Sequence, residues 1–120
     1  MSDKEYSSPP AIHVREYGKV VVLVVEGELF LGNIKGLEIV WDEQIEKKPE
    51  VIALNCGGIT FMDSSAIGSL VKFHNQAGRI GIQLVCIDLT PSLMKIFVAA
   101  KLDKIFTIVS EQEFKEKYPA

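Results

Sequence analysis

The sequence predicts a single α/β domain with a mostly parallel sheet of about five strands, an antiparallel edge strand and about four helices. Short apolar runs alternate with segments whose apolar residues recur every three or four positions, which is typical of strand–helix–strand units. The chain also opens with two strand-like runs joined by a short glycine-containing turn, which indicates a hairpin. Because 120 residues suit one domain, we assign residues 1–10 to a flexible polar tail and residues 11–118 to the domain.

The hairpin supplies the first two strands. Residues 11–17 alternate weakly between apolar and polar side chains, and Gly18-Lys19 makes the turn. Residues 20–25 are all apolar, so we expect this strand to lie inside the sheet. Gly27 and Gly32 are then expected to lead the chain out of the sheet.

A helix and a third strand follow. Asn33 is a candidate helix cap, and Trp41 is expected to pack in the core because it lies on the apolar face of that helix. Pro49 ends the helix. Residues 50–55 predict a buried strand, and we interpret Gly57-Gly58 as the turn that leaves it.

The stretch from Phe61 to Leu70 lies between this strand and the next helix, which should run from Ser64 to about Gln76. Asp63 suits the N-cap position. At 100° per residue, one arc of the helix is apolar and faces the core: Ala66, Ile67, Leu70, Phe73, His74 and Ala77. The opposite arc is open to solvent: Ser64, Ser65, Gly68, Lys72, Asn75 and Gln76, with Val71 at its edge beside Ser64.

The remaining elements repeat the strand–helix pattern. Gly78 is expected to end the helix. We then expect a strand at 80–87, a helix capped by Thr90 with Pro91 in its first turn, a strand at 105–109, and a last helix capped by Ser110 and Glu113.

Composition excludes several classes of function. Sixteen acidic and thirteen scattered basic residues give no clustered basic face for a nucleic acid. We expect a cytoplasmic protein with no membrane span, because the longest apolar run, residues 20–25, is too short. Cys56, Cys86, His13 and His74 lack the spacing of metal ligands, so no metal and no cofactor are expected. The two cysteines are expected to be buried free thiols, although a disulfide between them stays open.

The start of the central helix suits binding better than catalysis. A phosphate on Ser64 would add about −1.5 to −2 charges near the free amides of a helix N-terminus. A partner docked there would have to desolvate that charge, so phosphorylation would act as an off-switch. Gly68 lies one turn further on the same face, where the missing side chain suits either close approach of another protein or tight packing within this chain.

The residue patterns that the catalytic alternatives require are missing. Asp63-Ser64-Ser65 does not follow the Gly-x-Ser-x-Gly pattern, and His74 is expected on the core side. Gly57-Gly58 is not followed by the lysine of a phosphate-binding loop. We therefore expect no enzymatic activity. A ligand-binding crevice at the carboxyl ends of the parallel strands is a remaining alternative.

The motif Phe61-Met62-Asp63-Ser64-Ser65-Ala66-Ile67-Gly68 resembles the signature of STAS domains of the anti-sigma factor antagonist family. The segments Glu26-Gly27-Glu28-Leu29 and Lys101–Phe106 resemble two further family segments, so the resemblance extends over residues 12–118. It implies a bacterial partner-switching protein that binds an anti-sigma factor with serine kinase activity. Phosphorylation of Ser64 would release that partner, and a serine phosphatase would restore binding.

The resemblance also implies a partner-binding set around Ser64, namely Asp63, Ser65, Gly68, Val71, Lys72 and Phe30. Phe30 departs from the family pattern, which usually has an aspartate there, and Ala66 replaces a glycine. Phe30 is expected either to contact a partner or to fold under its own helix. A non-phosphorylated STAS scaffold in a transport or signalling complex is the alternative function. Formation of a homodimer is a further alternative.

Overall fold

The computed structural model describes residues 10–119, so the predicted tail lies outside the described residues except for Pro10. The elements follow in the order β1 (Ala11–Tyr17), β2 (Val20–Leu29), α1 (Ile34–Glu46), β3 (Val51–Met62), α2 (Ser64–Arg79), β4 (Gln83–Ile87), α3 (Pro91–Ala99), the 3-10 helix η2 (Leu102–Lys104), β5 (Thr107–Val109) and α4 (Glu111–Lys117).

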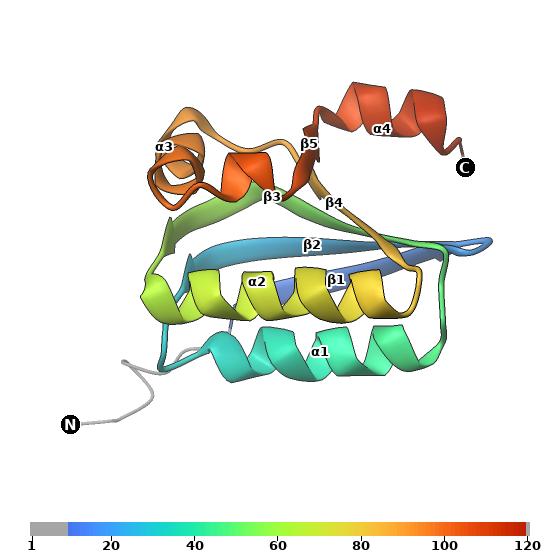
Figure 1. Cartoon of the computed structure of the whole chain (residues 1–120), viewed down its shortest axis with the longest axis horizontal. Helices are drawn as coiled ribbons and strands as arrows, with labels where there is room; N and C mark the ends of the chain where they lie inside the picture. Colours follow the sequence, from blue (N-terminus) through green and yellow to red (C-terminus); the bar gives the residue numbers. More distant parts are fainter. Residues whose placement is uncertain (1–9, 120) are drawn as a thin grey trace.

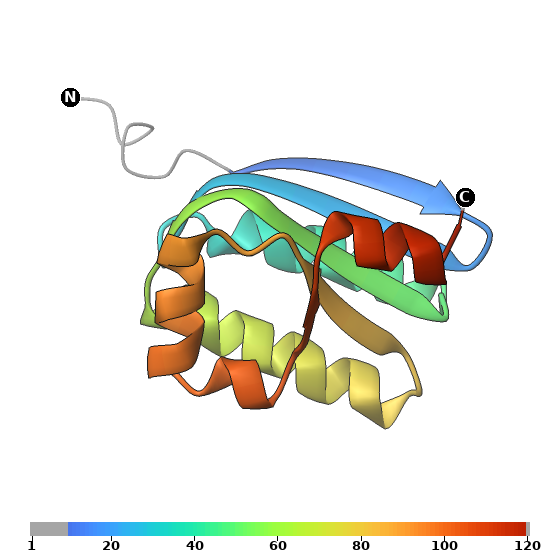
Figure 2. The same ribbon diagram turned by 90° about the horizontal axis from the view of Figure 1, so that it is seen from above.

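The strands form one sheet in the order β1-β2-β3-β4-β5. β1 pairs antiparallel with β2, and the other neighbours are parallel, which confirms the predicted α/β fold. Helices α1 and α2 lie side by side on one face of the sheet, and α4 lies over the opposite face (Figure 1). The view from above shows α3 beyond the ends of the strands, close to the start of α2 (Figure 2).

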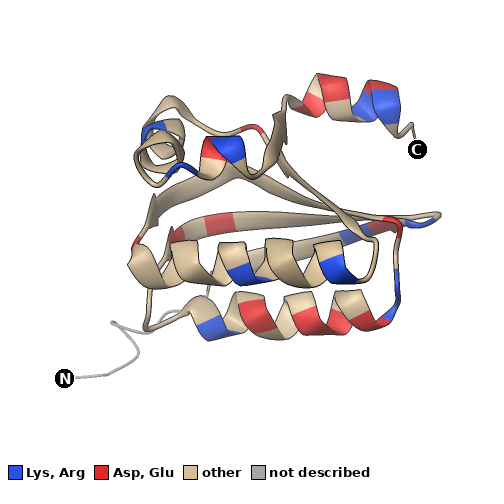
Figure 3. Cartoon of the chain, in the orientation of Figure 1, with Lys and Arg blue, Asp and Glu red and all other residues tan. Residues whose placement is uncertain are grey.

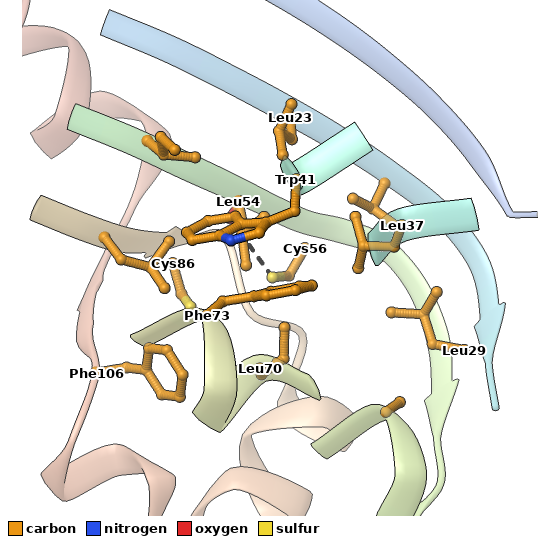
Figure 4. Packing of buried hydrophobic residues seen from close by; sticks show 14 of the residues in the cluster. Leu23, Leu29, Leu37, Trp41, Leu54, Cys56, Leu70, Phe73, Cys86 and Phe106 are labelled. Atoms are coloured by element: carbon orange, nitrogen blue, oxygen red, sulfur yellow. Dashed lines mark hydrogen bonds between the residues drawn. The ribbon is translucent and has the colours of Figure 1, made fainter. Parts of the chain in front are cut away.

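The main core fills the space between the sheet and helices α1 and α2. Trp41 is fully buried, as expected, and stacks on Phe73 with ring centroids 4.4 Å apart (Figure 4). Its indole N–H donates to Gln76 Oε1 at 2.9 Å, which joins the two helices and satisfies a buried polar group. Cys56 and Cys86 are buried free thiols in the same core, which confirms that prediction. A smaller cluster beneath α4 includes Phe114.

Strands β2 and β3 are longer than expected. The expected exit from the sheet at Gly27 is wrong, and so is the turn at Gly57-Gly58, because both segments continue the β2–β3 ladder. The ladder shifts register between Val24 and Glu26 and again at Gly27, whose φ is 104°. A Cβ on Gly58 would lie 2.7 Å from Glu26 Cγ. The glycines therefore permit bulges and close strand packing instead of ending the strands.

The other differences concern the ends of elements. Helix α2 continues through Gly78 to Arg79, three residues beyond the expected end at Gln76. The N–H groups of Ile80 and Ile82 then bond to Ala77 O, so β4 begins only at Gln83. Similarly, the N–H groups of Ile105 and Phe106 bond to Leu102 O, and this delays β5 until Thr107. The predicted caps Thr90 and Ser110 are confirmed, the latter with its full capping box.

Candidate functional site

Asp63 joins the start of α2 to the turn between β2 and α1. Its Oδ1 accepts the Ala66 N–H at 2.9 Å, which confirms the predicted N-cap. Its Oδ2 accepts the Leu31 N–H at 3.0 Å, and its own N–H donates to Leu29 O at 3.1 Å. The two loops at this end of the sheet are therefore one hydrogen-bonded unit.

Asn33 shapes the turn that Asp63 holds. It is the residue before α1, as expected, but its side chain does not cap the helix. Instead its Oδ1 accepts the Phe30 N–H at 2.9 Å, and its Nδ2 donates to Glu28 O at 2.7 Å. These bonds turn the chain back on itself, so that Leu31 lies at the outside of the turn.

The first turn of α2 presents the serines much as expected. Ser64 is exposed and Ser65 is half-buried, whereas Ala66 is buried in the core. Gly68 is exposed, and a Cβ added there would meet nothing within 4 Å. Internal packing therefore does not require this glycine, and the face beside Ser64 is open.

Two apolar side chains in the segments that meet at the start of α2 are exposed. Leu31 is 74% exposed, and its backbone bond to Asp63 places it beside the start of α2. Phe61, at the end of β3, is 45% exposed. Phe30 is half-buried, so Leu31 is the more exposed of the two neighbours. Leu31 was not among the predicted site residues, although an apolar residue before a turn glycine is a usable signal.

Further along α2, Val71 is half-buried and Lys72 is exposed. Lys72 lies eight residues beyond Ser64, which is about 12 Å along a helix. It also lines a groove between α1 and α2. Val71 and Lys72 therefore belong to the same helix as Ser64 but not to its first turn.

The chemistry available at Ser64 is that of anion binding at a helix start. Within residues 10–119, neither the Ser64 hydroxyl nor the first two amides of α2 make a hydrogen bond. Free amides and the helix dipole favour negative charge, whereas the neighbouring Asp63 carboxylate opposes it. A negatively charged group at Ser64 would therefore meet both unpaired amide donors and the opposing Asp63 carboxylate.

Catalytic pairing is not assembled here. His74 is half-buried and packs edge-on against Phe106, with ring centroids 5.3 Å apart. It lies ten residues along α2 from Ser64, which is about 15 Å on a helix. Among the described residues, no group of three or more His, Cys, Asp or Glu side chains could hold a metal ion. No helix within residues 10–119 has the length and apolar content needed to cross a lipid bilayer.

Comparison with known families identifies the fold. The model of the STAS domain family matches residues 11–114. This chain belongs to the STAS domain family. The match includes the β2–α1 turn and the start of α2, so the candidate site lies within the STAS domain.

One curated relative is described as a transporter. The sequence is 32% identical over 80 residues to YvdB of Bacillus subtilis, a protein described as a sulfate transporter. The match covers 67% of this chain but only 15% of YvdB. The STAS domain thus corresponds to a small part of that protein.

Solved structures with the same fold include anti-sigma factor antagonists. The antagonist from Mycobacterium paratuberculosis is 18% identical, with a TM-score of 0.76 over 83% of this chain and 85% of that chain. The phosphorylated form of the Bacillus cell fate determinant SpoIIAA is 19% identical, with a TM-score of 0.69 over 89% of this chain and 98% of that chain. A sulfate transporter family protein from Wolinella succinogenes is 18% identical, with a TM-score of 0.69 over 79% and 80%. At these identities the likeness concerns the fold.

Proposed function

We propose that this STAS domain is a partner-switching anti-sigma factor antagonist that binds a protein partner through the start of α2. The observation that carries the proposal is the exposed Ser64 hydroxyl beside the exposed Leu31 side chain. An apolar side chain next to a phosphorylatable hydroxyl suits a contact that forms while the serine is neutral. The partner would be an anti-sigma factor with serine kinase activity.

Phosphorylation of Ser64 would end that contact. The phosphate would bring about −1.5 to −2 charges close to the exposed Leu31, whose backbone N–H is hydrogen-bonded to Asp63. A docked partner would have to remove water from this charge, which costs several kcal/mol without a cationic partner group. The domain would itself perform no reaction, because the kinase transfers the phosphoryl group and a serine phosphatase removes it.

Asp63, Ser65 and Gly68 would support docking in different ways. Asp63 fixes the geometry through its bonds to Ala66 and Leu31. Gly68 leaves room for the partner backbone. Val71, Lys72 and Phe30 would lie at the edge of the contact.

Binding titrations with the purified anti-sigma factor kinase of the same organism test the proposal. Wild type and Ser64→Ala should bind with similar affinity, whereas Ser64→Asp should bind at least tenfold more weakly, equivalent to about 1.4 kcal/mol. Circular dichroism and thermal melting should show that both variants fold like the wild type. Equal affinity of Ser64→Asp and Ser64→Ala would contradict control through Ser64.

A second candidate is a STAS scaffold without phosphorylation, such as part of a transporter. It is favoured by the 32% identity to a segment of YvdB and by Phe30, which stands where the antagonists usually have an acid. Binding by a scaffold does not depend on the charge at Ser64, so Ser64→Asp would leave its affinity for the partner unchanged. The titration above separates the two candidates.

A further inference from the structure

Two exposed patches of opposite charge lie on different sides of the molecule. The α1 patch consists of Ile39, Asp42, Glu43 and Glu46, with Ile39 51% exposed. The α3–η2 patch consists of Lys95, Val98, Lys101, Lys104 and Ile105, with Val98 53% and Ile105 42% exposed. The first patch thus combines one exposed aliphatic side chain with three acids, and the second combines two exposed aliphatic side chains with three lysines. The exposed Lys35 lies one turn of α1 from Ile39, and the exposed Asp103 lies within the second patch.

The charges of both patches are free of intramolecular ion pairs. Within residues 10–119, the ion pairs join His13 to Glu26, Lys47 to Glu16, and Lys115 to Glu111. None involves a residue of either patch. The acids of α1 and the lysines of α3–η2 are therefore available to charges of another molecule.

A groove lies next to the α1 patch. It has a volume of about 170 Å³ and is lined by Lys35, Glu38, Ile39, Asp42, Lys72, Phe73 and Gln76. Ile39 at its rim and Phe73 at its wall are apolar, so an aliphatic side chain can enter between them. Val98 and Ile105 are aliphatic side chains of suitable size that project from the opposite patch.

The patches cannot meet within one molecule. Helix α2 lies between α1 and η2 in both views of the chain (Figures 1 and 2). The charge map shows α1 mostly red after a blue band at its start, whereas α3 is blue and η2 is both blue and red (Figure 3). A protruding apolar group that fits a groove elsewhere on the same surface produces a head-to-tail contact between copies.

We propose that the α1 patch and its groove bind the α3–η2 patch of a second copy of this chain, giving head-to-tail self-association. The contact joins acids to lysines around an aliphatic side chain in the groove. In such a pair, one copy keeps a free α1 patch and the other keeps a free α3–η2 patch, so further copies can add at both ends. The contact is small and partly electrostatic, so it weakens with salt.

Sedimentation of the full chain over a wide range of protein concentrations tests this. The weight-average mass should rise above the monomer mass in low salt and fall back at about 0.5 M salt, where charges are screened within a few ångströms. Ile39→Asp and Val98→Asp each break one patch at an exposed position, so each variant alone should stay monomeric. Their mixture should form dimers and nothing larger, because each variant contributes its one intact patch.

The controls separate this contact from others. Ser64→Asp should associate like the wild type, since Ser64 belongs to neither patch; loss of association would overturn the proposal. Thermal melting should confirm that both patch variants are folded. A monomeric wild type, association of either patch variant alone, or a mixture that stays monomeric would each overturn head-to-tail pairing.

Discussion

Oδ2 of Asp63 accepts the backbone N–H of Leu31 at 3.0 Å, across 32 residues of sequence. The same carboxylate caps α2 through its other oxygen. One side chain therefore sets both the start of the helix that carries Ser64 and the position of the most exposed apolar side chain beside it. This link makes the surface beside Ser64 preformed, as the proposed docking requires.

Replacing Asp63 tests that link. Asp63→Ala should lower the free energy of unfolding by about 1–3 kcal/mol, because it removes the cap and leaves the Leu31 N–H without its acceptor. Asp63→Asn is the matched variant: it keeps one oxygen for the cap and loses the second acceptor, so its cost should be smaller. Urea denaturation measures both, and an Asp63→Asn variant as stable as the wild type would contradict a role for the bond to Leu31.

Gly58 tests the explanation for the long β2–β3 ladder. Gly58→Ala should destabilise the fold by about 1–3 kcal/mol, because the new methyl group would lie 2.7 Å from Glu26 Cγ and 3.4 Å from Glu26 Cα. Gly57→Ala is the control, since its Cβ would meet Asn55 Oδ1 only at 3.4 Å. Thermal unfolding of both variants checks this. If Gly57→Ala were as unstable as Gly58→Ala, the loss would come from the backbone flexibility of glycine and not from contact of the new methyl group with Glu26.

Replacing Gly68 should change stability and partner binding in opposite directions. Gly68→Ala should raise the free energy of unfolding by up to about 1 kcal/mol, because alanine is the better helix former and its methyl group meets nothing within 4 Å. The same variant should bind the partner more weakly, since a side chain then occupies the docking face. Urea denaturation and the binding titration give the two readouts, and undiminished affinity would remove Gly68 from the contact.

The buried Cys56 thiol should make the free energy of unfolding depend on pH in the alkaline range. A hydrogen bond with the Cys86 thiol, together with complete burial, raises the pKa of the Cys56 thiol well above its ordinary value of 9.0. The unfolded chain then loses this proton before the folded chain does, so stability is full below pH 9 and falls as the pH rises above it.

Urea denaturation between neutral pH and roughly pH 9.5, below the ordinary pKa values of tyrosine and lysine of about 10 and 10.4, measures that fall. Cys56→Ala should be less stable at neutral pH but should lose stability less steeply above pH 9. Burial also raises the pKa of Tyr17, so the comparison is best made in a Tyr17→Phe background. Parallel slopes with and without Cys56 would contradict the thiol as the cause.

Local patterns predicted the order of elements, the hairpin and the caps at Asp63, Thr90 and Ser110. These features depend on residues close in sequence, which explains the agreement. The lengths of β2 and β3 could not be predicted, because glycines within a bulged ladder have the same sequence signal as turn glycines.

The candidate site was predicted only in its local part. Helical periodicity placed Ser64 and Gly68 on the open face, because that face depends on α2 alone. The exposure of Leu31 and its bond to Asp63 depend on how the β2–α1 turn folds against α2. The hydrogen bonds of Asn33 that shape this turn have no signature in the sequence beyond a candidate cap.

The most direct test of the central claim is the intact mass of the protein after incubation with ATP and its anti-sigma factor kinase. Wild type should gain one phosphoryl group, fragment analysis should place it on Ser64, and the modified protein should no longer bind the kinase in the titration. Ser64→Ala should gain none. An unmodified wild type, equal labelling of Ser64→Ala, or full binding by the phosphorylated protein would contradict the proposed switch.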